Sequence, residues 1–138
     1  MPEPDARATQ PPLIEARGLE KHFDGGRVLA LRGLDLTVRE GEVVAITGPS
    51  GCGKTTLLQL LGGLDLPSAG ELRFAGETIA ARRDLADFRA REIGFVFQSF
   101  HLIPTLTASE NVQVPMLGTG RPRRERVARA AELLASVG

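Results

Sequence analysis

The early part of the chain consists of short segments in which apolar and polar residues alternate. Residues 13–19 have the composition of a strand, and residues 34–38 (Leu-Asp-Leu-Thr-Val) show the period-two pattern of a half-buried strand. Between them, residues 24–27 (Asp-Gly-Gly-Arg) form a turn signal before a further apolar segment at 28–31. These patterns predict a small antiparallel sheet near the N-terminus.

Two other segments are apolar without alternation. Residues 43–47 (Val-Val-Ala-Ile-Thr) are β-branched at four of five positions, and residues 93–97 (Ile-Gly-Phe-Val-Phe) form a similar run. Such runs are typical of strands buried on both faces of a parallel sheet. A shorter strand is expected at 71–74, between turn signals at 67–70 and 75–76.

Helix signals lie between and after these strands. Residues 55–61 are good helix formers and stop at Gly62 and Gly63. Further helices are expected over 85–91 and 122–137. The last helix carries apolar side chains along one face: Val127, Ala130, Ala131, Leu134 and Val137.

Residues 107–110 (Thr-Ala-Ser-Glu) have the sequence of a capping box, in which Thr107 caps the backbone and Glu110 reaches back. A helix is therefore expected to begin there and to run to near Pro115, followed by a loop over 116–121. Together with the apolar runs, this predicts an α/β fold.

The composition limits the classes of protein. Seventeen basic residues balance seventeen acidic ones, so a strongly basic nucleic-acid surface is not expected. The single cysteine, Cys52, permits no intramolecular disulfide and suits a reducing compartment. No apolar run approaches the roughly 20 residues that span a bilayer, so any membrane association is expected to come through a partner. Residues 1–12, with four prolines, are expected to be a disordered lead-in.

One motif carries specific chemistry. Residues 48–55 match G-x-x-x-x-G-K-[ST], after a predicted buried strand and before a predicted helix. The glycines let backbone N–H groups curl around phosphate oxygens, and the helix start adds its positive dipole end. Lys54 would reach the β- and γ-phosphates, Thr55 would offer its hydroxyl to Mg²⁺, and Thr56 is an extra phosphate contact. The complete candidate set is Gly48, Pro49, Ser50, Gly51, Cys52, Gly53, Lys54, Thr55 and Thr56.

The loop alone does not choose among ATPases, GTPases and nucleotide kinases, but its surroundings do. Phe23 lies 25 residues before Gly48, and residues 93–98 lead into a segment that ends in Glu110-Asn-Val. With these elements in this order, residues 13–138 closely resemble the N-terminal part of the nucleotide-binding subunits of ABC transporters. The sequence around Gln98 is most similar to the bacterial branch of lipoprotein release, macrolide export and cell-division complexes.

The resemblance implies a role for each matching position. Phe23 would stack on adenine, where many relatives carry Tyr. Gln98 would touch Mg²⁺ or the attacking water and sense the membrane part of the transporter. Residues 98–115 would enter a helical subdomain that docks a membrane subunit. Its apolar residues are interface or core, and the sequence favours neither: Phe100, Leu102, Ile103 and Leu106.

The family fold implied is a P-loop NTPase core, a RecA-like parallel sheet, with an N-terminal antiparallel β-subdomain and the start of the α-helical subdomain. The expected cofactors are ATP and Mg²⁺. The expected partners are a transmembrane permease subunit and a second ATPase subunit, at the cytoplasmic face of the inner membrane, and no nucleic acid is expected.

The family's later motifs do not occur in residues 1–138: the Leu-Ser-Gly-Gly-Gln type signature, the apolar strand ending in Asp-Glu, and the switch histidine. We therefore expect residues 13–138 to be a partial domain that lacks its C-terminal half. It would bind ATP but barely hydrolyse it, although the parent protein would be an ATP hydrolase. A nucleoside-phosphate kinase and an ABC-type ATPase acting outside transport are the alternatives.

Overall fold

The structure is a computed structural model that describes residues 11–138, in two compact units. One unit ends at Leu85 and the other runs from Ala86 to Gly138. The disordered lead-in expected over residues 1–12 lies, for residues 1–10, outside the described part.

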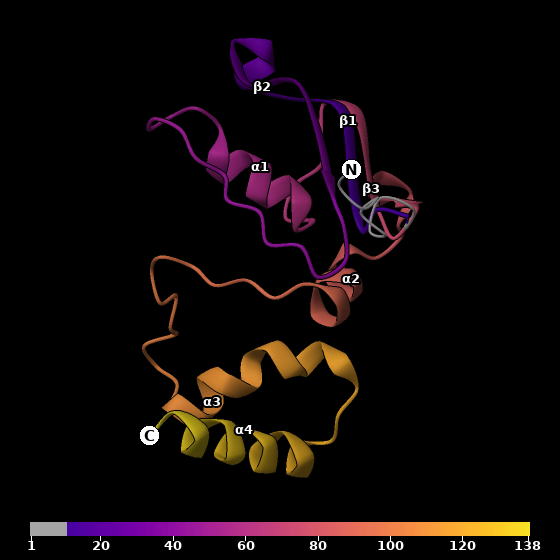
Figure 1. The fold of residues 1–138 in the computed structure, drawn as a ribbon. Helices are drawn as coiled ribbons and strands as arrows, with labels where there is room; N and C mark the ends of the chain where they lie inside the picture. Colours follow the sequence, from indigo (N-terminus) through magenta and orange to yellow (C-terminus); the bar gives the residue numbers. More distant parts are fainter. Residues whose placement is uncertain (1–10) are drawn as a thin grey trace, which may run out of the picture. The chain divides into compact units, whose positions relative to one another are not determined.

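The first unit contains the antiparallel sheet expected from the alternating segments (Figure 1). Its strand order is β2-β1-β3-β4, and every neighbouring pair is antiparallel. The elements are β1 (Ile14–Phe23), the 3₁₀ turn Asp24–Gly26, β2 (Val28–Val38), β3 (Ala69–Phe74), β4 (Glu77–Thr78) and the 3₁₀ turn Ile79–Ala81. The segments 28–31 and 34–38, expected as separate strands, are parts of the single strand β2. The pairing of β2 with β1 shifts register at several points, and these irregularities let β2 continue as one strand through residues 32 and 33.

The core of this unit lies between the sheet and α1 (Lys54–Leu61), which follows the glycine-rich loop and contacts β2. Leu57 and Leu60, three residues apart, are the buried residues of α1 and so lie on one side of it. The sheet and the turn after it contribute the remaining buried apolar side chains of the unit: Ala16, Leu19, Leu31, Leu72, Phe74 and Ile79. This packing fixes the start of α1 against the sheet.

The second unit is helical. It contains most of α2 (Leu85–Glu92), then α3 (Ala108–Gln113), the 3₁₀ segment Val114–Thr119, and α4 (Arg123–Val137), with α3 against α4 (Figure 1). The prediction of a loop over 116–121 is wrong in part, because the 3₁₀ segment extends to Thr119. The apolar face expected for α4 is only partly covered: Ala130 is buried, whereas Val127 and Val137 are exposed. Periodicity shows which side chains share a face but not whether another element covers that face.

The two runs expected as buried strands form no strand ladder within residues 11–138. Residues 43–47 and 93–97 have no assigned secondary structure, and Val43 and Val96 are almost fully exposed. A strand exists through hydrogen bonds to a neighbouring strand. An apolar run indicates that a segment suits a buried position in a sheet. The run does not determine whether a neighbouring strand is there to pair with it.

The capping box at the start of α3 is confirmed. Thr107 Oγ1 accepts from the Glu110 N–H at 3.2 Å, and Glu110 Oε2 accepts from the Thr107 N–H at 2.8 Å. The backbone and hydroxyl donors of Thr107 hold the pKa of Glu110 below its ordinary value. The contribution of ionised Glu110 to the stability of α3 is therefore present near neutral pH. This contribution is lost only as the pH falls through the lowered pKa of Glu110.

Replacing Thr107 by Ala removes the side-chain acceptor of this cap. A lost N-cap typically costs about 1 kcal/mol, so amide hydrogen exchange in Ala108–Gln113 is expected to accelerate about fivefold. Thr105→Ala, two residues before the cap, is the matched control and should leave exchange unchanged. Equal exchange rates in Thr107→Ala and the unmodified chain would show that the cap does not stabilise α3.

Candidate nucleotide-binding site

The phosphate-loop motif forms a turn that leads directly into α1. Gly53 is the N-cap residue, with φ 92° and ψ 5°, and the Leu57 N–H donates to the Gly53 carbonyl at 2.8 Å. A Cβ atom on Gly53 would lie 2.5 Å from the Ala30 carbonyl oxygen and 3.0 Å from Leu31 Cδ2. The glycine is therefore needed both for its left-handed backbone and for the close approach of the loop to β2.

The side chain of Lys54 folds back over the loop. Its Nζ donates to the Gly48 carbonyl at 2.8 Å and to the Pro49 carbonyl at 2.6 Å, and lies 3.6 Å from Cys52 Sγ. An ammonium has three donors and can exchange such carbonyl partners for phosphate oxygens. The loop thus holds one positive charge at its mouth.

The start of α1 adds backbone donors to this charge. The N–H groups of Lys54, Thr55 and Thr56 lie in the first turn, where an α-helix offers no carbonyl partner. The first turn carries no acidic side chain, so nothing there opposes an anion. The same residues line a cavity of about 230 Å³, together with the start of β2: Val28, Leu29, Ala30, Gly51, Gly53, Lys54, Thr55 and Thr56. This donor set is suited to a polyphosphate.

Thr55 has the chemistry expected of a Mg²⁺ ligand. Its side chain is exposed at the first turn of α1, and a hydroxyl oxygen is the hard donor that Mg²⁺ prefers. Mg²⁺ usually keeps several waters and takes further oxygens from substrate phosphates, so one protein hydroxyl fits the role. Thr55 as a metal ligand remains a prediction.

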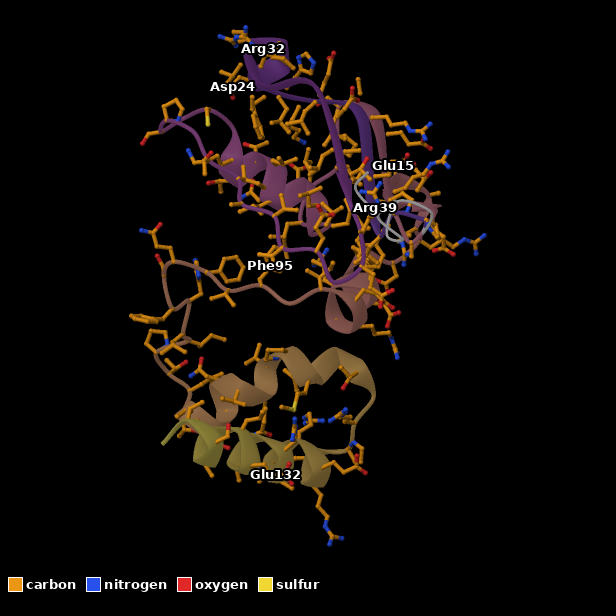
Figure 2. All side chains as sticks on the ribbon, viewed as in Figure 1. Glu15, Asp24, Arg32, Arg39, Phe95 and Glu132 are labelled. Carbon is orange, nitrogen blue, oxygen red and sulfur yellow. The ribbon has the colours of Figure 1, made fainter. Side chains whose placement is uncertain are left out.

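Phe23 is the last residue of β1, directly before Asp24, which Figure 2 labels. It pairs with Val28, which lines the cavity, and 37 % of its surface is exposed. The structure therefore brings the aromatic residue and the phosphate loop into one unit. Its stacking on a base remains a prediction.

Lys21, to which no sequence motif assigns a role, lies beside this aromatic ring. Its Nζ is 5.3 Å from the centroid of the Phe23 ring and 2.7 Å from Asp65 Oδ1. The i, i+2 spacing on a strand could have indicated the shared face with Phe23. Nothing in the sequence links Lys21 to Asp65, which is 44 residues away.

Gln98 belongs to the second unit and is exposed. In the chain it lies between Phe97 and His101, two members of an aromatic group: the ring centroids of Phe95 and Phe97 are 5.3 Å apart in a stacked pair, and those of Phe97 and His101 are 4.7 Å apart in an edge-on pair. Figure 2 labels Phe95 on this stretch of chain without regular secondary structure. The role of Gln98 toward Mg²⁺ or water remains a prediction.

The chain has relatives among known proteins. Residues 31–138 match the ABC transporter family. MacB, the macrolide export ATP-binding/permease protein of Nitrosomonas europaea, is 51 % identical over 133 residues, which are 93 % of this chain and 20 % of that protein. PvdT, the pyoverdine export ATP-binding/permease protein of Pseudomonas syringae pv. tomato, is 51 % identical over 132 residues, with 92 % and 20 % covered. This chain thus spans about a fifth of the length of these relatives.

The chain is also similar to solved structures of ABC transporter cassettes. The dimeric structure of MJ0796, a bacterial ABC transporter cassette, matches with a TM-score of 0.78 at 40 % identity, over 88 % of this chain and 56 % of that one. A dimeric post-hydrolysis state of MJ0796 bound to ADP and Pi matches with a TM-score of 0.77 at 39 % identity, over the same shares of the two chains. These matches confirm the expected fold class. Within residues 11–138, no helix is both long and apolar enough to cross a membrane.

Proposed function

Because this chain belongs to the ABC transporter family, we propose that it binds MgATP as part of an ATPase that couples ATP binding and hydrolysis to transport across, or extraction from, a membrane. The observation that carries the proposal is the loop over 48–55, in which the Lys54 ammonium lies over carbonyls at the start of α1. A chance glycine-rich turn has no reason to place a lysine and helix-start amides around one cavity.

The loop residues would divide the work of holding the triphosphate. The backbone amides at the start of α1 would donate to phosphate oxygens, and the Lys54 ammonium would neutralise charge on the β- and γ-phosphates. Thr55 would hold Mg²⁺, which when bound shields the phosphate charge, and Thr56 would add a hydroxyl contact. Phe23 would stack on adenine, and Gln98 would contact the metal or the attacking water.

Hydrolysis needs more than these groups. Phosphoryl transfer depends on positioning and charge neutralisation by several parts at once, and residues 1–138 contain no Asp-Glu strand end and no signature motif. We therefore expect these residues to bind ATP and to hydrolyse it very slowly, and we assign hydrolysis to the parent protein.

A transmembrane permease and a second ATPase subunit are the proposed partners, and the cytoplasmic face of the inner membrane is the proposed location. In the second unit Phe100 is 90 % and Leu102 64 % exposed, and Ile103 is also exposed. Leu106, the fourth apolar residue of this segment, is half-buried, and it lines an apolar cavity of about 470 Å³ beside α3 together with Leu102 and Ile103. Exposed apolar side chains of this kind favour an interaction surface, which supports the permease.

The proposal is tested by displacement of a fluorescent ATP analogue from the chain by ATP, GTP and GMP, with Mg²⁺ present. MgATP is expected to displace the analogue, and GMP is not. Transfer of phosphate from ATP to GMP, followed in the same samples, would support the nucleoside-phosphate kinase in place of the transporter ATPase. Failure of the folded chain to bind any nucleotide would contradict the proposal.

Phe23→Leu is expected to lower the affinity for MgATP by about 5- to 140-fold, because stacking of a base on an aromatic ring is worth about 1–3 kcal/mol. Affinity for inorganic tripolyphosphate, which has no base, should not change. Calorimetric titration with both ligands measures the difference. An equal loss of affinity for MgATP and for tripolyphosphate would show that the substitution disturbs the phosphate loop rather than base stacking.

A further inference from the structure

Lys21 connects the predicted base-stacking ring to the segment that follows α1. Its Nζ donates to Asp65 Oδ1 at 2.7 Å and to the Leu66 carbonyl at 2.8 Å, and lies 5.3 Å from the Phe23 ring centroid. Only 12 % of the Lys21 side chain is exposed. A lysine on the surface of a sheet is usually mobile and solvated, whereas this one is held by two oxygen acceptors and an aromatic ring.

The segment that holds Lys21 is itself fixed at both ends. At the helix end, the N–H of Leu64 donates to the Gln59 carbonyl of α1 at 2.8 Å. At the sheet end, Ser68 bonds to β1 twice: its N–H donates to the Glu20 carbonyl at 2.9 Å, and its Oγ accepts from the His22 N–H at 3.0 Å. The anchor of Lys21 is therefore continuous with the helix that begins at Lys54.

The lowered pKa of Asp65 supports a persistent contact between Lys21 and Asp65. The hydrogen bond from Lys21 is the main cause that holds the pKa of Asp65 below its ordinary value. Asp65 is thus ionised near neutral pH and keeps the ammonium in place. A cation within about 6 Å of a ring centroid is attracted to the ring face, and Phe23 has no hydroxyl through which a hydrogen bond could set the ring's orientation.

We propose that Lys21 is a positioning residue for the base of the bound nucleotide: its ammonium, anchored by Asp65 and the Leu66 carbonyl, fixes the Phe23 ring for stacking. The inference rests on the proposed function, since it needs a nucleotide on residues 48–55. Lys21 acts through the ring and makes no contact with phosphate. Its loss should therefore affect only ligands that carry a base.

The test compares Lys21→Met with the unmodified chain in calorimetric titrations with MgATP and with Mg-tripolyphosphate. Lys21→Met is expected to weaken MgATP binding by about 3- to 10-fold, in line with the strength of a partly desolvated cation–π contact, and to leave tripolyphosphate binding unchanged. Arg17→Met is the matched control, because it removes a cation of the same strand that pairs with Glu15 instead. It should change neither affinity.

A second variant separates positioning from folding. Asp65→Asn keeps the lysine but removes the carboxylate charge that anchors it. Like Lys21→Met, it should therefore lower the MgATP affinity. In a Phe23→Leu background, Lys21→Met should have no further effect, because the ring through which it acts is gone.

The outcomes distinguish the two proposals. If the unmodified chain binds neither ligand, the proposed function fails and this inference fails with it. If it binds both and Lys21→Met weakens both equally, or weakens neither, the proposed function stands and the positioning role of Lys21 is overturned. The same conclusion follows if Lys21→Met still weakens MgATP binding in the Phe23→Leu background.

Discussion

Replacing Lys54 by Ala is expected to lower the affinity for MgATP by about 100-fold or more. The Lys54 ammonium lies over the loop, where it bonds to the Gly48 and Pro49 carbonyls. Hydrogen bonds to charged groups are worth about 1.5–3 kcal/mol each, and at least two to the triphosphate would be lost. The phosphates would then lose the ammonium charge that lies over the loop.

Displacement of a fluorescent ATP analogue measures this loss. Gln59→Ala is the matched control, because it alters an exposed side chain of the same helix and keeps good helix propensity. Circular dichroism establishes that both variants keep the helical content of the unmodified chain. If Lys54→Ala binds MgATP within a few-fold of the control, the nucleotide does not sit on this loop.

Gly70→Ala is expected to have the largest effect on folding, a loss of at least about 3 kcal/mol in the free energy of unfolding. Gly70 has φ +81° in β3, and a Cβ atom there would lie 2.2 Å from the Gly18 carbonyl oxygen and 2.7 Å from that of Arg17. These are backbone atoms of β1, so no side chain can move aside. The β1–β3 pairing, on which the sheet depends, would have to open.

Gly76→Ala separates this clash from backbone strain. Gly76 has φ +82°, almost the same value, but a Cβ there meets nothing within 4 Å. A non-glycine residue in the left-handed region costs about 1–2 kcal/mol by itself. Urea unfolding followed by far-UV circular dichroism should therefore rank Gly70→Ala as clearly the less stable variant. Equal losses in the two variants would show that β3 does not approach β1 as closely as described.

The parts of the fold that could be predicted from sequence are those with local causes. The phosphate loop and the helix after it are set by adjacent residues, and so are the capping box of Thr107 and Glu110 and the turn after Phe23. In each case a glycine, a cap or a turn residue acts on its immediate neighbours. The structure agrees at each of these positions.

The rest depends on partners that are distant in the sequence. Residues 43–47 and 93–97 have strand composition, but pairing requires a neighbouring strand that composition does not specify. The ion pair of Lys21 and Asp65 joins residues 44 positions apart and has no local signal. The role of Gln98 was inferred from family resemblance, and its place in the second unit leaves that role a prediction.

The central claim is that a nucleotide binds on the loop over 48–55, and Cys52 offers the most direct test. It is the only cysteine, it is exposed, and it lies within that loop. The measurement is the rate at which a thiol reagent labels Cys52 with and without saturating MgATP. We predict that MgATP slows labelling in the unmodified chain, that GMP does not, and that Lys54→Ala removes the protection. Equal labelling rates with and without MgATP, in a folded sample, would contradict the account.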